Sequence, residues 1–316
     1  KAKTFQEFKA QTYKEPFEGG KYIVNGDTPI LNEKLLQEFF ETQIKEPISS
    51  DGRPRVKLTV HQVNGQDAVW NSIEKRQLTY CVSKTFGTNY NQMVSDMLAA
   101  GGAWEAVGAV DFIHVAGEDD SCTASNPNVV FDVRPVNVNG QYLARAFFSF
   151  FPPSARNALV ANGSSLQYPH GKVSRQGLLR HELGHTLGFR HEHTRPDSGT
   201  CFEDNNWRPV TSYDAFSVMH YPQCNGKGDW SLNLTNIDKN GAACLYGHAQ
   251  GFTVDTSICQ EPEEPLLPIA CGPKTETFTG QSVAKNEEKS YGPFGVAPGT
   301  LVEVTMHGEA NPGDPD

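Results

Sequence analysis

The segment HELGHTLGFRHE, at residues 181–192, contains three histidines and two glutamates. His181 and His185 are four residues apart, so on a helix they share one face and lie about 6 Å apart along its axis. Gly188 can leave the helix through a left-handed turn that other residues resist. Such a turn would bring His191 back to the first two rings. The spacing therefore predicts one metal ion held by three imidazoles.

The same segment predicts the chemistry of that metal. Three histidines leave one coordination position of Zn²⁺ open for water, which is typical of catalytic rather than structural zinc sites. Zinc lowers the pKa of its bound water towards 7. Glu182, next to His181, faces that water and can take its proton as the general base. The pattern HExxHxxGxxH is that of the metzincin zinc peptidases, which cleave peptide bonds.

Further residues extend the motif. Phe189 and Glu192 turn it into HExxHxxGFxHE, HTRPD follows at 193–197, and FSVMHYP at 216–222 supplies a turn centred on Met219. With Trp70 and the late stretch DKNGAACLYG, these features resemble the astacin family of metzincins over roughly residues 69–247.

The resemblance implies roles for three residues. Met219 would lie beneath the zinc as a hydrophobic floor. Tyr221 would be a switchable fifth metal ligand, whose hydroxyl moves to the oxyanion in the transition state. Glu192 would contact the freed N-terminus of the mature enzyme.

An upstream stretch is expected to block this site. FEGGKYIVNGDTPI, at 17–30, contains VNGD, which resembles the FxGD element of astacin prosegments, with Val24 in place of the family's phenylalanine. The resemblance implies that Asp27 binds the zinc and displaces the water. A carboxylate is a good zinc ligand, and Gly26 allows the backbone to approach closely. The alternative is that residues 25–27 form a simple β-turn.

Four parts of the chain are expected. Residues 1–57 would be an inhibitory prosegment, released by an activating protease that cuts near Arg53 or Arg55 in a stretch rich in turn formers. A zinc metallopeptidase catalytic domain would span 58–250, and a proline-rich linker 251–273. Residues 274–316 would be a β-rich C-terminal extension. It resembles the start of the small β-sandwich domain that ends many secreted bacterial peptidases, and it would then be cut mid-domain.

The apolar patterns predict an α+β fold. Helices are expected at 31–44 with Asn32 as the cap, at 91–107 with a break at the glycines, at 174–188 and at 235–247. Strands are expected at 77–86, 110–117, 128–136, 144–151 and 301–306. The resemblance implies a metzincin-type arrangement of two subdomains around a cleft, with a twisted mixed sheet and an active-site helix. The strand at 144–151 would be an edge strand that holds an extended substrate by strand addition.

Composition narrows the partners. The net charge of −10 argues against nucleic acid as the main partner. No apolar run approaches the roughly 18–20 residues that span a bilayer. The opening KAKTFQEFKA is too polar for a signal peptide, so an export signal is expected to have been removed already. A protein or peptide substrate is expected, and the sequence leaves the oligomeric state open.

Seven cysteines at scattered positions indicate disulfides in a secreted protein rather than a structural zinc site. Cys201–Cys224 and Cys259–Cys271 are the expected local pairs. One thiol among Cys81, Cys122 and Cys244 would then be unpaired.

The residues leave two other functions open. One is a zinc hydrolase that acts on a non-peptide ester or amide. The other is a zinc-stabilised binding or adhesion module without turnover. Glu182 argues against the binding module, because such a module needs no general base beside its metal ligands.

Overall fold

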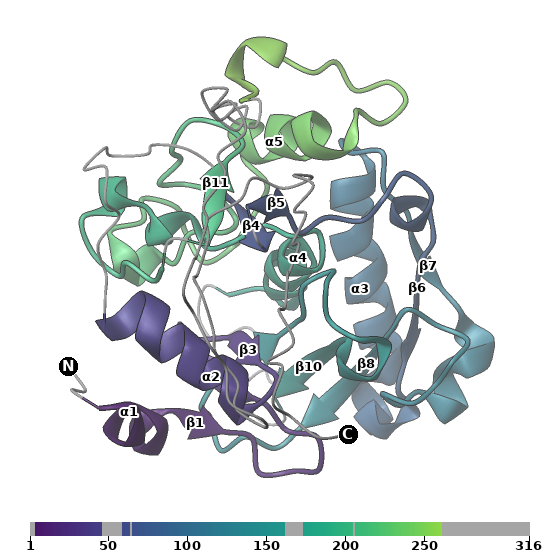
Figure 1. Ribbon diagram of the computed structural model, residues 1–316. Helices are drawn as coiled ribbons and strands as arrows, with labels where there is room; N and C mark the ends of the chain where they lie inside the picture. Colours follow the sequence, from purple (N-terminus) through teal and green to yellow (C-terminus); the bar gives the residue numbers. More distant parts are fainter. Residues whose placement is uncertain (1–3, 46–58, 64, 162–172, 205, 261–316) are drawn as a thin grey trace, which may run out of the picture. The chain divides into compact units, whose positions relative to one another are not determined.

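The structure is a computed structural model that describes residues 4–45, 59–63, 65–161, 173–204 and 206–260 of the 316. These residues belong to one compact unit, Lys1–Pro262 (Figure 1). Helices and strands are mixed along the chain, so the expected α+β class is confirmed. The predicted cutting sites Arg53 and Arg55, the strand at 301–306 and residues 274–316 lie outside the described residues.

A five-stranded mixed sheet lies at the centre of this unit. Its order is β7 (Phe112–His114), β6 (Leu78–Val82), β8 (Phe131–Val136), β10 (Asn157–Ala161) and β9 (Ala144–Arg145). Neighbours from β7 to β10 run parallel, and β9 pairs antiparallel with β10. Strand β9 is therefore an edge of the sheet, as predicted, but it is much shorter than the expected 144–151. Phe147, Phe148 and Phe151 turn instead into the hydrophobic core.

Two helices cover one face of the sheet. Helix α3 (Tyr90–Glu105) and helix α4 (Arg175–Thr186) pack against each other, and their apolar residues share one core with Val133, Ala158 and Val160 of the strands (Figure 1). The expected break in α3 is wrong. Gly101 lies within the continuous helix, where an added Cβ would come within 3.1 Å of Phe112, so glycine here lets the helix approach β7 closely.

The opposite face of the sheet is covered by residues from the N-terminal segment, residues 4–45. Ile23, with Tyr13 and Phe17 packed beside it, joins a second apolar cluster with Val136 and Leu159 of the sheet. The segment comprises α1 (Phe5–Gln11), β1 (Tyr13–Lys14), β2 (Tyr22–Val24), β3 (Thr28–Ile30), α2 (Glu33–Phe39) and the π-helical turns η1 (Phe40–Lys45). Asn32 caps α2, as predicted, by accepting a hydrogen bond from the backbone of Leu35.

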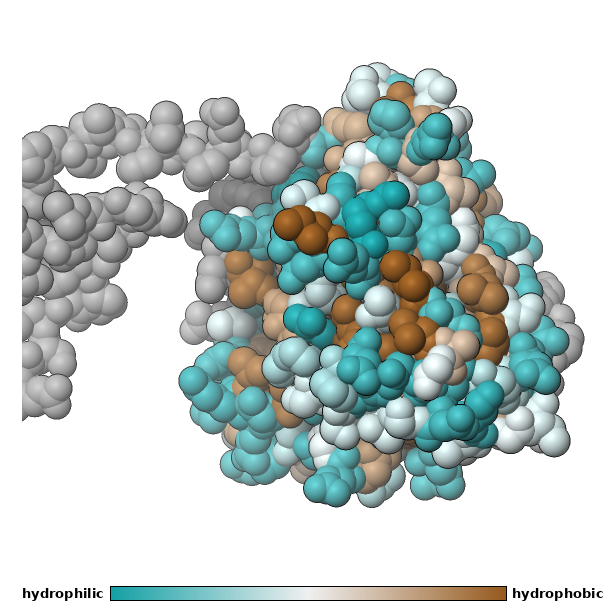
Figure 2. All heavy atoms as spheres, turned by 90° about the vertical axis from the view of Figure 1, so that its right-hand side faces the viewer, coloured by the Kyte–Doolittle hydropathy of each residue, from teal (hydrophilic) through white to brown (hydrophobic). Residues whose placement is uncertain are grey.

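The remaining described elements complete the unit. A small sheet joins β11 (Trp207–Pro209), β4 (Thr59–Val63) and β5 (Gln66–Asp67). Helix α5 (Asn236–Tyr246) matches the expected late helix and begins with a capping box formed by Thr235 and Asp238. Figure 2 views the side on which α3, β6 and β7 lie, and shows apolar groups separated by polar atoms. In the described part of the chain, no helix is long and apolar enough to cross a membrane.

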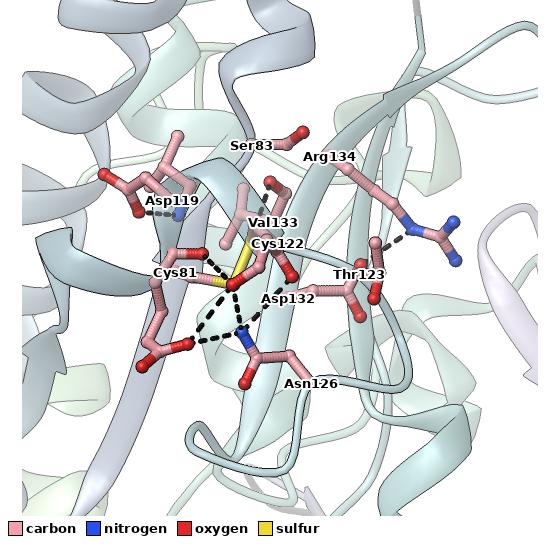
Figure 3. The surroundings of a disulfide bond; sticks show 12 residues. Cys81, Ser83, Asp119, Cys122, Thr123, Asn126, Asp132, Val133 and Arg134 are labelled. Carbon is pink, nitrogen blue, oxygen red and sulfur yellow. Dashed lines mark hydrogen bonds and ion pairs between the residues drawn. A yellow bond between two sulfur atoms is a disulfide. The ribbon is translucent and has the colours of Figure 1, made fainter.

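Three disulfides link described residues: Cys81–Cys122, Cys201–Cys224 and Cys244–Cys259. The second confirms the prediction. The first joins β6 to the loop before β8 (Figure 3).

Two predictions about the cysteines are wrong. One is the Cys259–Cys271 pair, and the other is an unpaired thiol among Cys81, Cys122 and Cys244. The backbone of Asp255 donates a hydrogen bond of 2.7 Å to Asn240 of α5, and this contact folds the chain back so that Cys259 meets Cys244. Cys271 lies outside the described residues.

Candidate metal centre

Helix α4 and the turn after it bring the three predicted histidines together. His181 and His185 lie on the buried helix, one turn apart. Gly188 then adopts a φ of +90°, the left-handed conformation that the sequence predicts. A Cβ at this position would also lie 2.5 Å from the carbonyl oxygen of Ala68. The turn directs His191, which is fully buried, back towards the helix.

The three Nε2 atoms point to a common centre. The distance from His191 Nε2 is 3.3 Å to His181 Nε2 and 3.2 Å to His185 Nε2. Two zinc ligands at roughly 2.0–2.1 Å and a tetrahedral angle would lie about 3.3 Å apart. The spacing of the nitrogens therefore fits a single Zn²⁺.

The other ring nitrogens fix the tautomers of these histidines. The Nδ1 atoms of His181 and His185 lie 2.7 and 2.8 Å from the backbone oxygens of Val218 and Phe189. Nδ1 of His191 lies 2.5 Å from Oε1 of Glu203. Backbone carbonyl and carboxylate oxygens can only accept hydrogen bonds, so each Nδ1 carries the ring proton. The lone pair of each Nε2 therefore remains able to bind a metal.

Asp27 reaches the same centre from the N-terminal segment. It lies in the hairpin turn between β2 and β3, where Asn25 and Gly26 both have positive φ. An added Cβ on Gly26 would lie 3.1 Å from the ring and the hydroxyl of Tyr221. The two predictions for residues 25–27, a β-turn and a metal ligand, are thus compatible, because the turn places Asp27 next to the histidines.

The carboxylate of Asp27 is buried among these groups. Its Oδ1 lies 3.2 Å from His191 Nε2 and 3.7 Å from His185 Nε2, and Oδ2 lies 3.4 Å from His181 Nε2. Tyr221 donates a hydrogen bond of 2.5 Å to Oδ2. Oδ1 accepts no hydrogen bond from any described residue. This buried carboxylate oxygen, which accepts no hydrogen bond, and the three nitrogen lone pairs together form a set of ligands that suits a zinc ion.

Glu182 lies next to the ligands on α4. Its side chain is buried, and α4 packs here against β9. Burial and the nearby carboxylate of Asp27 raise the pKa of Glu182 well above its ordinary value. Burial and Asp27 also raise the pKa of Tyr221. The carboxyl of Glu182 therefore lies close to both Asp27 and His191.

Two further residues lie next to the histidines in the fold: Met219 packs against Gly184 of α4, and Glu192 directly follows His191. Met219 is fully buried. A Cβ added at Gly184, between His181 and His185 in the sequence, would lie 2.4 Å from the sulfur of Met219, so glycine is needed at this position of α4. The carboxylate of Glu192 is buried as well, and it accepts hydrogen bonds from Arg195 and from the backbone of Asp214.

The sequence analysis missed a charged cluster behind His191. Oε1 of Glu203 contacts His191 and lies 3.2 Å from Nε2 of His193, and Oε2 accepts a hydrogen bond of 3.0 Å from Arg190. Arg190 also forms a bidentate pair with Asp204. His191 and Arg190 hold the pKa of Glu203 well below its usual range although burial opposes them. The Glu203-Asp204 acid pair is the one sequence signal that could have indicated this cluster.

Known proteins share part of this sequence. The chain is 37% identical over 82 residues to the astacin-like metalloprotease toxin 2 of Loxosceles intermedia. The aligned region covers 20% of this chain and 32% of the toxin. It is 36% identical over 74 residues to the zinc metalloproteinase nas-30 of Caenorhabditis elegans. This aligned region covers 17% of this chain and 10% of nas-30. No protein-family model matches the chain. These relatives are matched over about a third of their length or less, and the matches support a relationship to astacin-like metalloproteases.

Proposed function

We propose that this protein is a secreted zinc endopeptidase of astacin type, held latent by Asp27. The observation that carries the proposal is the meeting of three histidine Nε2 atoms with one buried carboxylate from the N-terminal segment. The partial similarity to astacin-like metalloproteases supports the same function. We assign the zinc to His181, His185 and His191, with Asp27 as an additional ligand in the intact chain.

The protein groups around the zinc would divide the work of peptide hydrolysis. Zinc, when bound, supplies a Lewis acid that acidifies water and polarises a carbonyl. Glu182 would accept the proton of the attacking water and pass it to the leaving amine. Tyr221 would donate its hydroxyl hydrogen to the oxygen that becomes negative. The outer edge of β9, which pairs with no strand among the described residues and packs against α4, would hold an extended peptide through backbone hydrogen bonds.

Latency would follow from the place that Asp27 takes. Its carboxylate lies at the convergence of the three histidines and also holds the hydroxyl of Tyr221. Neither a water molecule nor a substrate oxygen can share that position. We therefore assign residues 1–57 to an inhibitory prosegment and residues 58–250 to the catalytic domain, joined by the linker 251–273 to the extension 274–316.

Release of the prosegment would be followed by a rearrangement at Glu192. Its Oε2 is buried and accepts no hydrogen bond from the described residues. This oxygen is available for the new N-terminus that an activating protease would create near Arg53 or Arg55. Three disulfides are consistent with an oxidising, extracellular location.

A casein assay tests the function. The zinc-loaded full chain is compared before and after limited trypsin treatment, with trypsin then inhibited, and each sample is repeated with a zinc chelator. We expect slow cleavage by the intact chain, rapid cleavage after treatment, and none with chelator present. Treated, zinc-loaded protein that leaves casein intact would contradict the proposal.

A further inference from the structure

A buried ion pair joins the N-terminal segment to the edge strand of the sheet. Both oxygens of Glu15 accept hydrogen bonds from Arg145 of β9, from Nε at 2.6 Å and from the other nitrogen of the fork at 2.8 Å. Tyr142 donates a further bond of 2.6 Å, and the backbone of Lys21 one of 2.7 Å. The side chain of Glu15 is 0% exposed and that of Arg145 1%. This geometry is that of a specific carboxylate receptor.

The receptor is held in shape by the sheet itself. Nη1 of Arg145 donates a hydrogen bond of 2.8 Å to the side chain of Asn157 on the neighbouring strand β10. That contact does not involve the N-terminal segment, so it would persist after the segment leaves. The edge of the guanidinium that now binds Glu15 would then lose its ion-pair partner, which is strongly unfavourable for a buried charge, and the nearby carboxylate of Asp132 is already paired with Arg134 at 2.7 Å. Arg145 consequently requires another anion or solvent when Glu15 departs.

The receptor lies beside the proposed catalytic centre. Strand β9, which contains Arg145, packs against α4, the helix that contains Glu182. Arg145 pairs with Leu159 in the sheet register, and therefore points to the face that the N-terminal segment covers. A peptide added to the free edge of β9 would place the side chain opposite Arg145 on that same face, with the two Cβ atoms about 5 Å apart.

We propose that Arg145 is a specificity residue that receives an acidic side chain of the substrate, and that Glu15 occupies this subsite in the intact chain. The inference rests on the proposed function and extends it to the class of substrate. Glu15 then blocks side-chain recognition while Asp27 blocks the metal. Arg134 lies on the same face of the sheet near the subsite, where it forms an ion pair of 2.7 Å with Asp132.

Peptide pairs test the subsite in the full chain. Each pair differs only by Glu or Gln at one position, and the position is moved along the sequence on both sides of the cleaved bond. Three zinc-loaded proteins are compared: Asp27→Ala, Asp27→Ala with Glu15→Ala, and Asp27→Ala with Glu18→Ala. Glu18 is an exposed glutamate of the same segment and is the matched control.

We expect the Glu/Gln ratio of kcat/KM to rise to about tenfold at one position when Glu15 is removed. The ratio should stay near one in the other two proteins. Adding Arg145→Met to the Glu15→Ala protein should return it to one, and Arg145→Lys should retain a smaller preference. Should Arg145→Met lose its zinc, the comparison of Glu15→Ala with Glu18→Ala still decides.

Two failures are distinguishable. If none of these proteins cleaves any peptide, the proposed function itself is wrong. If all cleave, but the ratio is near one at every position after Glu15 is removed, the subsite is wrong and the endopeptidase proposal stands.

Discussion

The hydroxyl of Tyr221 donates a hydrogen bond of 2.5 Å to Oδ2 of Asp27, although 194 residues separate them in the chain. The resemblance to astacins implies that both residues bind the zinc, Tyr221 as a switchable ligand and Asp27 as the blocking one. In the folded chain the blocking carboxylate also holds the tyrosine. Departure of Asp27 would therefore free the metal position and the oxyanion donor in the same event.

The first prediction concerns Asp27. Replacing it with alanine removes the carboxylate that lies 3.2 Å from His191 and should leave the zinc open to water and substrate. We expect the intact Asp27→Ala chain to cleave casein at least about tenfold faster than the intact wild type. Glu18→Ala, in the same segment, should remain latent. Equal activity of wild type and Asp27→Ala, with both fully active, would show that Asp27 does not block the site.

The second prediction concerns Glu182. Its carboxylate is buried close to Asp27 and His191, and we propose that it acts as the general base. Glu182→Ala in the activated protein should lower kcat by about 10²–10⁴-fold. Zinc content, measured by atomic absorption, should stay at one per chain. Undiminished peptide cleavage by this variant would remove the proposed mechanism.

The third prediction concerns Glu203, which supports His191 from behind. Glu203→Ala removes the acceptor of the Nδ1 proton and should weaken zinc binding by about 10–100-fold, as measured by competition with a chelating dye. Glu18→Ala is again the control and should bind zinc as the wild type does. Unchanged zinc affinity in Glu203→Ala would mean that His191 needs no support from this carboxylate.

The fourth prediction is a dependence of stability on pH. Asp132 lies on β8 close to the Cys81–Cys122 disulfide (Figure 3), and burial raises its pKa to about 6 although Arg134 and Arg145 oppose the shift. Because the folded protein then keeps a proton that the unfolded chain loses near pH 3.8, this residue makes stability fall as pH rises from about 4 to 6.

Asp132→Asn should abolish that fall. Urea unfolding should show the variant to be more stable than the wild type at pH 7, by on the order of 1–3 kcal/mol, with the difference much reduced at pH 4. Asp120→Asn, at an exposed aspartate, is the control. A variant that is no more stable than the wild type at pH 7 would contradict the raised pKa.

The local sequence predicts most features that lie within a single helix or at its ends. The helical spacing of His181 and His185 and the left-handed turn at Gly188 follow from backbone geometry alone, and the structure shows both. The cap at Asn32 is similarly local.

Long-range contacts could not be predicted in the same way. Glu15 meets Arg145 across 130 residues, and Glu203 meets His191 through a loop that contains two short 3-10 helices. The Cys244–Cys259 pair depends on how the chain folds back on α5, which spacing alone does not determine. Similarly, Phe147, Phe148 and Phe151 pack into the core instead of extending β9, because burying them outweighs extending the strand pairing.

The most direct test of the account is anomalous diffraction at the zinc absorption edge from crystals of the zinc-loaded intact chain. We expect one zinc peak per chain, bonded to Nε2 of His181, His185 and His191 at roughly 2.0–2.1 Å and to an oxygen of Asp27. A chain without a zinc peak at these histidines would contradict the metal centre. A peak whose remaining ligand is water, with Asp27 turned away, would contradict latency.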